Sequence, residues 1–142
     1  MYTPPGFATV TPYIFVESAE HFCHFLVAGL GGTEIGRALR EDGKIANAQI
    51  RLGNCTIMVS EAGRGYPAMP ASYYLYVPDA KAAMARAIAA GAQEIMPVQD
   101  MPYQDRQGGI RDAHGNFWWI SQRLVPGGYH DAEEGAAKTK AN

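Results

Sequence analysis

The sequence has few cysteines and no long apolar segment. Cys23 and Cys55 are the only two cysteines among its 142 residues, too few for a disulfide framework, which favours a soluble, cytoplasmic protein. The run 65–78, which carries no charged residue, contains three prolines and is shorter than the ~18 apolar residues that a membrane span needs. The first residues show no basic region followed by an apolar stretch, so we predict no signal peptide.

A strong excess of charge is also absent. Charged residues make up 18% of the chain and the net charge is −2, which gives no electrostatic reason to expect a nucleic acid partner. Apolar residues make up 47%, too many for a disordered chain. A chain of this length buries roughly 68% of its unfolded surface, so it needs neither disulfides nor a metal ion to fold.

The chain shows an internal repeat. Shifting the sequence by about 61 positions aligns YIFVESA (13–19) with YLYVPDA (74–80), and NCTIMVS (54–60) with GNFWWIS (115–121). The identity is low, but the order of predicted elements agrees in both halves. We therefore predict two copies of one supersecondary unit.

Each copy is predicted to be a β-α-β-β-β unit. Alternating, aromatic-rich strands at 11–16 and 72–77 open the two copies, and Ser18 and Asp79 are the predicted N-caps of the helices that follow. Gly31-Gly32 can supply the left-handed stop at the end of the first helix. Three shorter strands then complete each copy, at 34–40, 46–52 and 55–60 in the first half and at 94–99, 107–112 and 116–123 in the second.

These elements divide the chain into five segments. The tail has almost nothing to bury, so we expect it to be mobile. The segments are an N-terminal arm (1–8), a first βαβββ unit (9–62), a linker (63–70), a second βαβββ unit (71–125) and a mobile tail (126–142).

One segment also resembles a known family. GGIRDAHGNFWWIS (108–121) is similar to the Gly-Gly-Val-Arg-Asp-Pro-x-Gly-x-x-Trp-x-Ile run of the vicinal oxygen chelate superfamily, and TPYIFVESAEHFCHFL (11–26) resembles its opening. That superfamily includes glyoxalase I, extradiol dioxygenases and bleomycin-resistance proteins, and the resemblance is nearest to the bleomycin-resistance-like and PhnB-like branches. It implies an α+β fold in which two tandem βαβββ units form a curved mixed sheet around a cleft, with the helices on the outer face.

The parity of the strands separates two rows of side chains. One row is almost wholly apolar, runs through Ile14, Ile57, Leu75 and Trp118, and should lie under the helices. The other combines aromatic rings with small hydroxyls and fixed cations, which suits a flat ligand with polar edges. The predicted ligand-binding residues, including one in the loop 100–106, are Tyr13, Phe15, Arg51, Met58, Tyr74, Tyr76, Tyr103, Arg111, Phe117 and Trp119.

Each of these residues also has a structural interpretation. The second row could form a plain dimer interface, or simply fill the concave side of the sheet. Arg51 and Arg111 could bind an anionic group, or each could form a salt bridge to a neighbouring acid such as Glu17, Glu61 or Asp112. Tyr103 is either a lid over the cleft or an ordinary loop residue.

The resemblance also places the family's four metal-ligand positions. They fall on Thr11, Met58, Ser72 and Trp119, none of which is the His, Glu or Asp that a divalent ion needs. His21 and His24 lie three apart on the first helix, but without a nearby carboxylate they fit a solvated helix flank better than a metal site. We therefore predict no metal site and no cofactor.

These patterns predict a metal-independent small-molecule binding protein, similar to bleomycin-resistance proteins, that sequesters a planar aromatic or peptide-antibiotic-like ligand. We can nominate no catalytic base or nucleophile. A metal-dependent lyase, isomerase or dioxygenase of the glyoxalase type is the alternative, supported by the fold resemblance alone. A third hypothesis is a structural or regulatory subunit whose second row is covered by a partner.

A homodimer is expected in each case, because two small units leave a broad surface and exposed strand edges. The sequence does not decide whether the two units pair within one chain or swap between chains.

Overall fold

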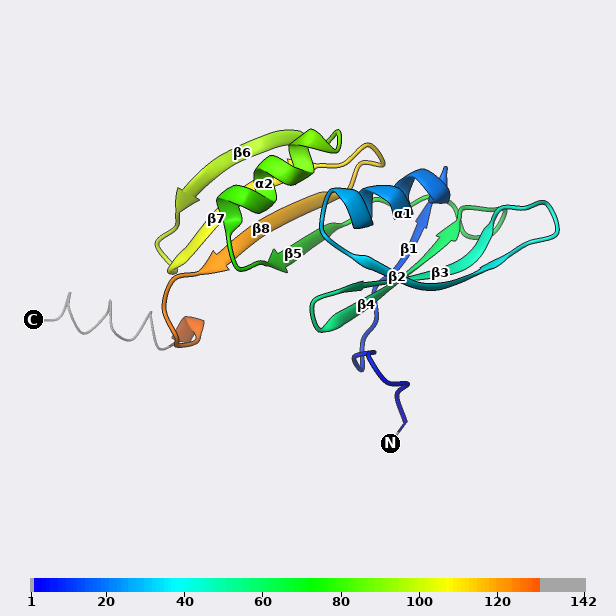
Figure 1. Ribbon diagram of the computed structural model, residues 1–142, viewed down its shortest axis with the longest axis horizontal. Helices are drawn as coiled ribbons and strands as arrows, with labels where there is room; N and C mark the ends of the chain where they lie inside the picture. Colours follow the sequence, from blue (N-terminus) through cyan, green and yellow to red (C-terminus); the bar gives the residue numbers. More distant parts are fainter. Residues whose placement is uncertain (1, 131–142) are drawn as a thin grey trace, which may run out of the picture.

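The computed structural model describes residues 2–130, and it confirms the α+β class and the doubled βαβββ order (Figure 1). The predicted strands agree with the observed ones within about two residues at each end. Of the expected mobile tail, residues 131–142 lie outside the described part of the chain. The first unit contains β1 (Tyr13–Val16), α1 (Ala19–Ala28), β2 (Thr33–Leu39), β3 (Ile45–Leu52) and β4 (Cys55–Glu61), and the second contains β5 (Ser72–Tyr76), α2 (Ala80–Ala89), β6 (Gln93–Asp100), β7 (Asp105–Arg111) and β8 (Phe117–Arg123).

Each unit forms its own four-stranded mixed sheet. The strand orders are β1-β4-β3-β2 and β5-β8-β7-β6, and only the pairs β1–β4 and β5–β8 are parallel. The registers of the two sheets correspond, since Tyr13 lies opposite Met58 and Tyr74 lies opposite Trp119. The repeat seen in the sequence is therefore a repeat of pairing as well as of element order.

The two helices begin in different ways. The Asp79 side chain accepts a hydrogen bond from the Ala82 amide at 3.1 Å, as predicted for an N-cap. The prediction was wrong for Ser18, whose backbone is left-handed (φ 59°) and whose side chain makes no capping bond. The Glu61 carboxylate, from the end of β4, instead accepts from the amides of Ser18 and Ala19 at 2.9 and 3.0 Å.

The helices cover one face of their sheets, and the core lies between. The side chains predicted to lie under the helices are largely buried, and Trp118 is only 2% exposed. Tyr73 stacks on Trp118 with ring centroids 4.7 Å apart, and Leu75 and Val77 are half-buried against the same core. The inward-facing apolar row was therefore predicted correctly.

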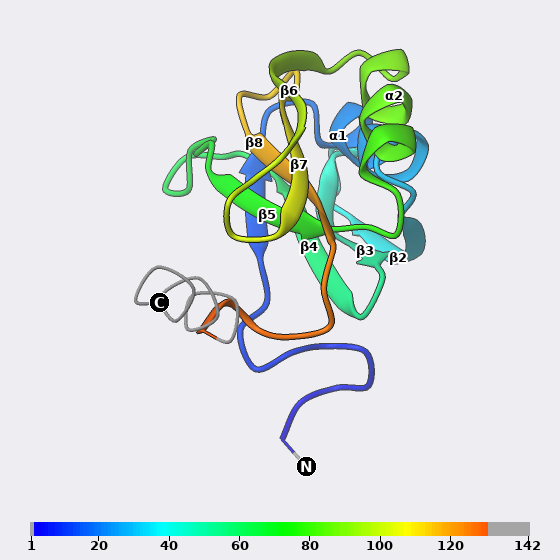
Figure 2. The ribbon, with the colours of Figure 1, turned by 90° about the vertical axis from the view of Figure 1, so that its left-hand side faces the viewer.

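The two units contact each other through their helices. Figure 2 shows α1 and α2 on the same side of the molecule, and Arg86 of α2 donates to the carbonyl oxygens of Ala28 and Val27 at the end of α1. His114, in the turn between β7 and β8, packs its ring against His21 and Phe22 of α1. No helix among the described residues is long and apolar enough to cross a membrane.

Candidate functional site

The face of each sheet that is turned away from the helices is called the open face here. It carries nine of the ten predicted ligand-binding residues on the expected parity, and Tyr103 lies in the loop before β7. Tyr13, Tyr74 and Tyr76 are between 45% and 48% exposed, so these large rings are available to a ligand or partner. Tyr13, Phe15, Arg51 and Met58 belong to the first sheet, and Tyr74, Tyr76, Arg111, Phe117 and Trp119 belong to the second.

The aromatic side chains meet within each sheet. On the first sheet, the rings of Tyr13 and Phe15 lie 4.7 Å apart, and the Tyr13 hydroxyl is 2.8 Å from the Ser60 hydroxyl. On the second sheet, Tyr74 and Tyr76 lie 5.2 Å apart, and Phe117 and Trp119 meet edge to face at 6.2 Å. The predicted residues therefore form two aromatic groups rather than one.

The polar centre of the second open face is Asp105, which the sequence interpretation missed. Its side chain is fully buried, and its Oδ2 accepts hydrogen bonds from the hydroxyls of Tyr74 at 2.6 Å and of Tyr76 and Tyr129 at 2.9 Å. Arg123 donates to Oδ1 at 3.1 Å. Asp105 and Arg123 lie opposite each other in register, so strand parity extended by two residues along β8 would have placed Arg123 on this face.

The surroundings of Tyr74 favour its protonated form. Burial, followed by the hydrogen bond to Asp105, raises the pKa of Tyr74 well above its ordinary value. The phenol is therefore a hydrogen-bond donor at every physiological pH. Its ring is held by the carboxylate below it and presents a pre-oriented surface for stacking.

Tyr103 reaches the same region from the loop between β6 and β7. Its hydroxyl donates to the side-chain carbonyl of Gln107, and its ring meets that of Tyr129 edge to face at 6.3 Å. The turn that contains Tyr103 ends at Gln104, whose backbone is left-handed (φ 70°). The Gln104 amide donates to the Met101 carbonyl. Tyr103 therefore borders the Asp105 cluster.

Arg51 and Arg111 do not form the salt bridges that were considered for them. Two of the acids considered are engaged elsewhere: Glu61 caps α1, and Asp112 accepts from Trp118 Nε1 at 2.8 Å. Within residues 2–130, the four ion pairs involve other cations, and the one side-chain bond of Arg51 goes to the Gly53 carbonyl at 3.3 Å. Both guanidinium groups lie at exposed positions where they can meet an anionic group.

The four positions that the resemblance assigned to a metal do not fit a metal ion in this chain. Trp119 Nε1 donates to the Ser72 hydroxyl at 2.8 Å, and the Thr11 hydroxyl donates to the Ala8 carbonyl at 3.2 Å. An indole has no lone pair for coordination, and the Met58 thioether is a soft, neutral donor. Across the described range 2–130, no three His, Cys, Asp or Glu side chains gather as a metal site would require.

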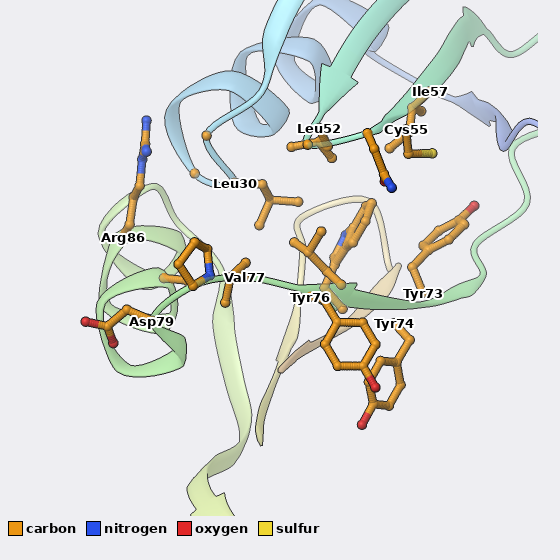
Figure 3. Close-up of a pocket in the computed structure, with 18 of the residues that line it drawn as sticks. Leu30, Leu52, Cys55, Ile57, Tyr73, Tyr74, Tyr76, Val77, Asp79 and Arg86 are labelled. Atoms are coloured by element: carbon orange, nitrogen blue, oxygen red, sulfur yellow. The ribbon is translucent and has the colours of Figure 1, made fainter. Parts of the chain in front are cut away.

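A separate cavity of about 680 Å³ lies between the two units on the helix side (Figure 3). Leu30 and Leu52 of the first unit face Val77 of the second across it, whereas the rings of Tyr74 and Tyr76 point away. It is therefore distinct from the open faces. Sequence parity could not reveal it, because it depends on how the two units pack together.

The fold and the open faces define a class: a small protein built of two βαβββ repeats, each presenting an aromatic sheet surface. The model of the Glyoxalase/Bleomycin resistance protein/Dioxygenase superfamily matches residues 6–120. The chain belongs to this superfamily, as its motifs indicated. An uncharacterized protein of Mycobacterium bovis is 27% identical over 124 residues, which cover 80% of this chain and 82% of that protein.

Solved structures share the fold. TioX from Micromonospora sp. ML1 is 24% identical with a TM-score of 0.67, and the match covers 82% of this chain and 99% of TioX. TnmS3, an antibiotic binding protein from Streptomyces sp. CB03234, is 17% identical with a TM-score of 0.63, covering 82% and 97%. The PhnB protein from Bacillus cereus is 16% identical with a TM-score of 0.64, covering 81% and 99%.

Proposed function

We propose that this protein binds a small planar aromatic molecule on its open sheet faces and sequesters it without chemical change or a metal ion. The observation that carries the proposal is the second open face, where exposed Tyr74 and Tyr76 donate to a buried carboxylate and half-buried Trp119 lies opposite Tyr74 in register. Aromatic surfaces with a few fixed polar groups are typical of sites for flat ligands.

The arginines add a charge preference to this surface. Arg111 lies opposite Phe117 in register, beside the aromatic group, and Arg51 has the equivalent place on the first sheet. A guanidinium can hold a carboxylate or phosphate by two parallel hydrogen bonds. The preferred ligand is therefore a planar aromatic that carries an anionic group.

The metal-free part of the proposal rests on the donor set described above. In the glyoxalase-type alternative, a metal ion held by hard or borderline ligands would polarise the substrate oxygen. Thr11, Met58, Ser72 and Trp119 do not supply them, and two of these side chains are bonded to each other. The glyoxalase-type alternative therefore lacks its central group at the family's positions.

The named relatives are consistent with a binding role. One protein that shares the fold is described as an antibiotic binding protein. Its identity to this chain is only 17%, so it supports sequestration as a type of function and does not indicate the ligand.

We also propose that the protein acts as a homodimer. Strand β5 lies at the edge of its sheet, and no side chain along it is fully buried, which is unusual for a strand beside a core. A second copy would cover this strand and complete the ligand site.

Tryptophan fluorescence tests the binding function directly. We expect 2-naphthoate and acridine-9-carboxylate to quench Trp119 saturably, with 2-naphthamide binding more weakly because it lacks the charge for Arg111. Tyr74→Ala should lower the affinity at least tenfold, whereas Ile88→Ala, at a 41% exposed position of α2, should leave it unchanged. No saturable change with either carboxylate would refute the proposal.

Elemental analysis of protein purified without a chelator tests the metal-free part separately. We expect far less than one equivalent of Zn, Ni, Mn or Fe per chain. Near-stoichiometric metal would instead favour the lyase, isomerase or dioxygenase alternative.

A further inference from the structure

The end of the described chain turns back onto the open face of the second sheet. Beyond β8, Gly127, Gly128 and Tyr129 all contact residues of this face. The Tyr129 hydroxyl donates to Asp105 Oδ2 at 2.9 Å, and its ring meets that of Tyr103 edge to face. The first residues of the segment that was expected to have nothing to bury therefore take part in the candidate site.

The guanidinium group of Arg123 holds the segment 127–129 in place with most of its N–H donors. Its Nε donates to the Gly127 carbonyl and its Nη2 to the Gly128 carbonyl, both at 3.0 Å. Its Nη1 donates to the Tyr103 carbonyl at 2.6 Å and to Asp105 at 3.1 Å, and its guanidinium lies 4.9 Å from the centre of the Tyr129 ring. The tripeptide 127–129 therefore presents two carbonyl acceptors and one phenol to a site built by Asp105, Arg123 and Tyr103.

This site can lose Tyr129 without leaving a buried charge unpaired. Tyr74 and Tyr76 donate to the same oxygen of Asp105, and Arg123 donates to the other. The carboxylate would keep three donors after Tyr129 departs, which avoids the large penalty of an unsatisfied buried anion. Tyr129 itself is 43% exposed, so the burial of its ring contributes little to keeping it in this position. The tyrosine is therefore an exchangeable occupant.

The geometry points to a subsite for hydroxyaryl compounds that bear a carbonyl group, which the chain's own Tyr129 occupies until such a ligand displaces it. The inference rests on the proposed function and specifies part of the ligand. Asp105 accepts hydrogen bonds and repels anions, so the group that meets it must be a neutral donor such as a phenol. Arg123 Nε and Nη2, once released from the two glycine carbonyls, require an acceptor.

Calorimetric titration of the 142-residue chain tests this exchange. The probes are N-acetyl-tyrosinamide, which carries a phenol and carbonyls like the displaced segment, and N-acetyl-phenylalaninamide, which lacks only the hydroxyl. Tyr129→Ala should bind the tyrosine probe at least tenfold more tightly than the unchanged chain, because the internal competitor is gone. Tyr2→Ala removes another exposed tyrosine, in the N-terminal arm, and should change nothing.

Two results would overturn the inference. One is equal affinity for the tyrosine probe in Tyr129→Ala and the unchanged chain. The other is equal binding of the two probes to Tyr129→Ala, which would show that Asp105 does not select a hydroxyl. Quenching of Trp119 by 2-naphthoate distinguishes the two levels: if it persists, the proposed function stands and only the subsite fails, and if it is also absent, both fail.

Discussion

At the scale of single residues, Asp112 is the side chain on which the turn between β7 and β8 depends. It is 4% exposed and accepts hydrogen bonds from the amides of His114 and Asn116, from the Asn116 side chain and from Trp118 Nε1. Asp112→Ala would leave several buried donors unpaired, so we expect the free energy of unfolding to fall by about 3 kcal/mol or more. Urea denaturation measures this loss.

The matched control for Asp112 is Asp100, a carboxylate in an exposed ion pair. Asp100 bonds Arg106 at 2.8 Å on the surface of β6. Solvent and salt screen such exposed pairs, which contribute little to stability, so Asp100→Ala should shift the urea midpoint only slightly. Equal losses in the two variants would show that the Asp112 network does not stabilise the fold.

His114 is expected to make stability depend on pH. Burial, together with the neighbouring His21, lowers the pKa of His114, while Asp112 and Glu61 act in the opposite direction. The folded state therefore binds this proton less readily than the unfolded state does. Stability is lost as the pH falls through the ordinary histidine pKa near 6.5 toward the lowered folded value.

His114→Phe keeps the ring against Phe22 and removes the titration. The urea midpoint of the variant should fall less between pH 7.5 and pH 5.5 than that of the unchanged chain. The remaining titratable groups are the same in both proteins, so the difference isolates His114. A fall of the same size in both proteins would contradict the prediction.

At the scale of elements, the two helix starts predict opposite responses to substitution. Ser18 is left-handed and makes no capping bond, so Ser18→Gly should stabilise the protein by about 0.5–1 kcal/mol by relieving the backbone. Asp79 does cap α2, so Asp79→Ala should destabilise it by about 1 kcal/mol. Thermal unfolding of both variants measures whether each substitution raises or lowers stability. A loss of stability in Ser18→Gly would show that the Ser18 side chain stabilises the fold.

The same contrast explains which elements could be predicted from the sequence. Alternation and turn residues are local signals, and they placed every strand and the apolar row that includes Ile14 and Trp118. The cap of α1 is not local, because Glu61 reaches Ser18 from 43 residues away. A serine before a helix favours an N-cap, but a carboxylate from a neighbouring strand took that role.

The candidate site divides in the same way. Parity placed Tyr74, Tyr76 and Trp119 on the open face because strand geometry decides it. Asp105 was missed because the predicted strand 107–112 began two residues after it, and Tyr129 was missed because its approach depends on a chain reversal after β8. That reversal has no signature in hydrophobic periodicity.

At the scale of the whole molecule, one chain leaves apolar surface that a second copy would bury. The cavity between the units is lined by half-buried Leu30, Leu75 and Val77 and opens to solvent beside edge strand β5. Native mass spectrometry should therefore show a species of twice the 15.4 kDa of one chain.

Leu30→Asp should shift it to monomer, because a carboxylate buried at the interface without a partner is strongly unfavourable. Ile35→Asp, at a 59% exposed position on β2, is the matched control and should leave the dimer intact. A monomer in the unchanged chain, or a dimer that resists Leu30→Asp, would mean that this cavity is not where two copies meet.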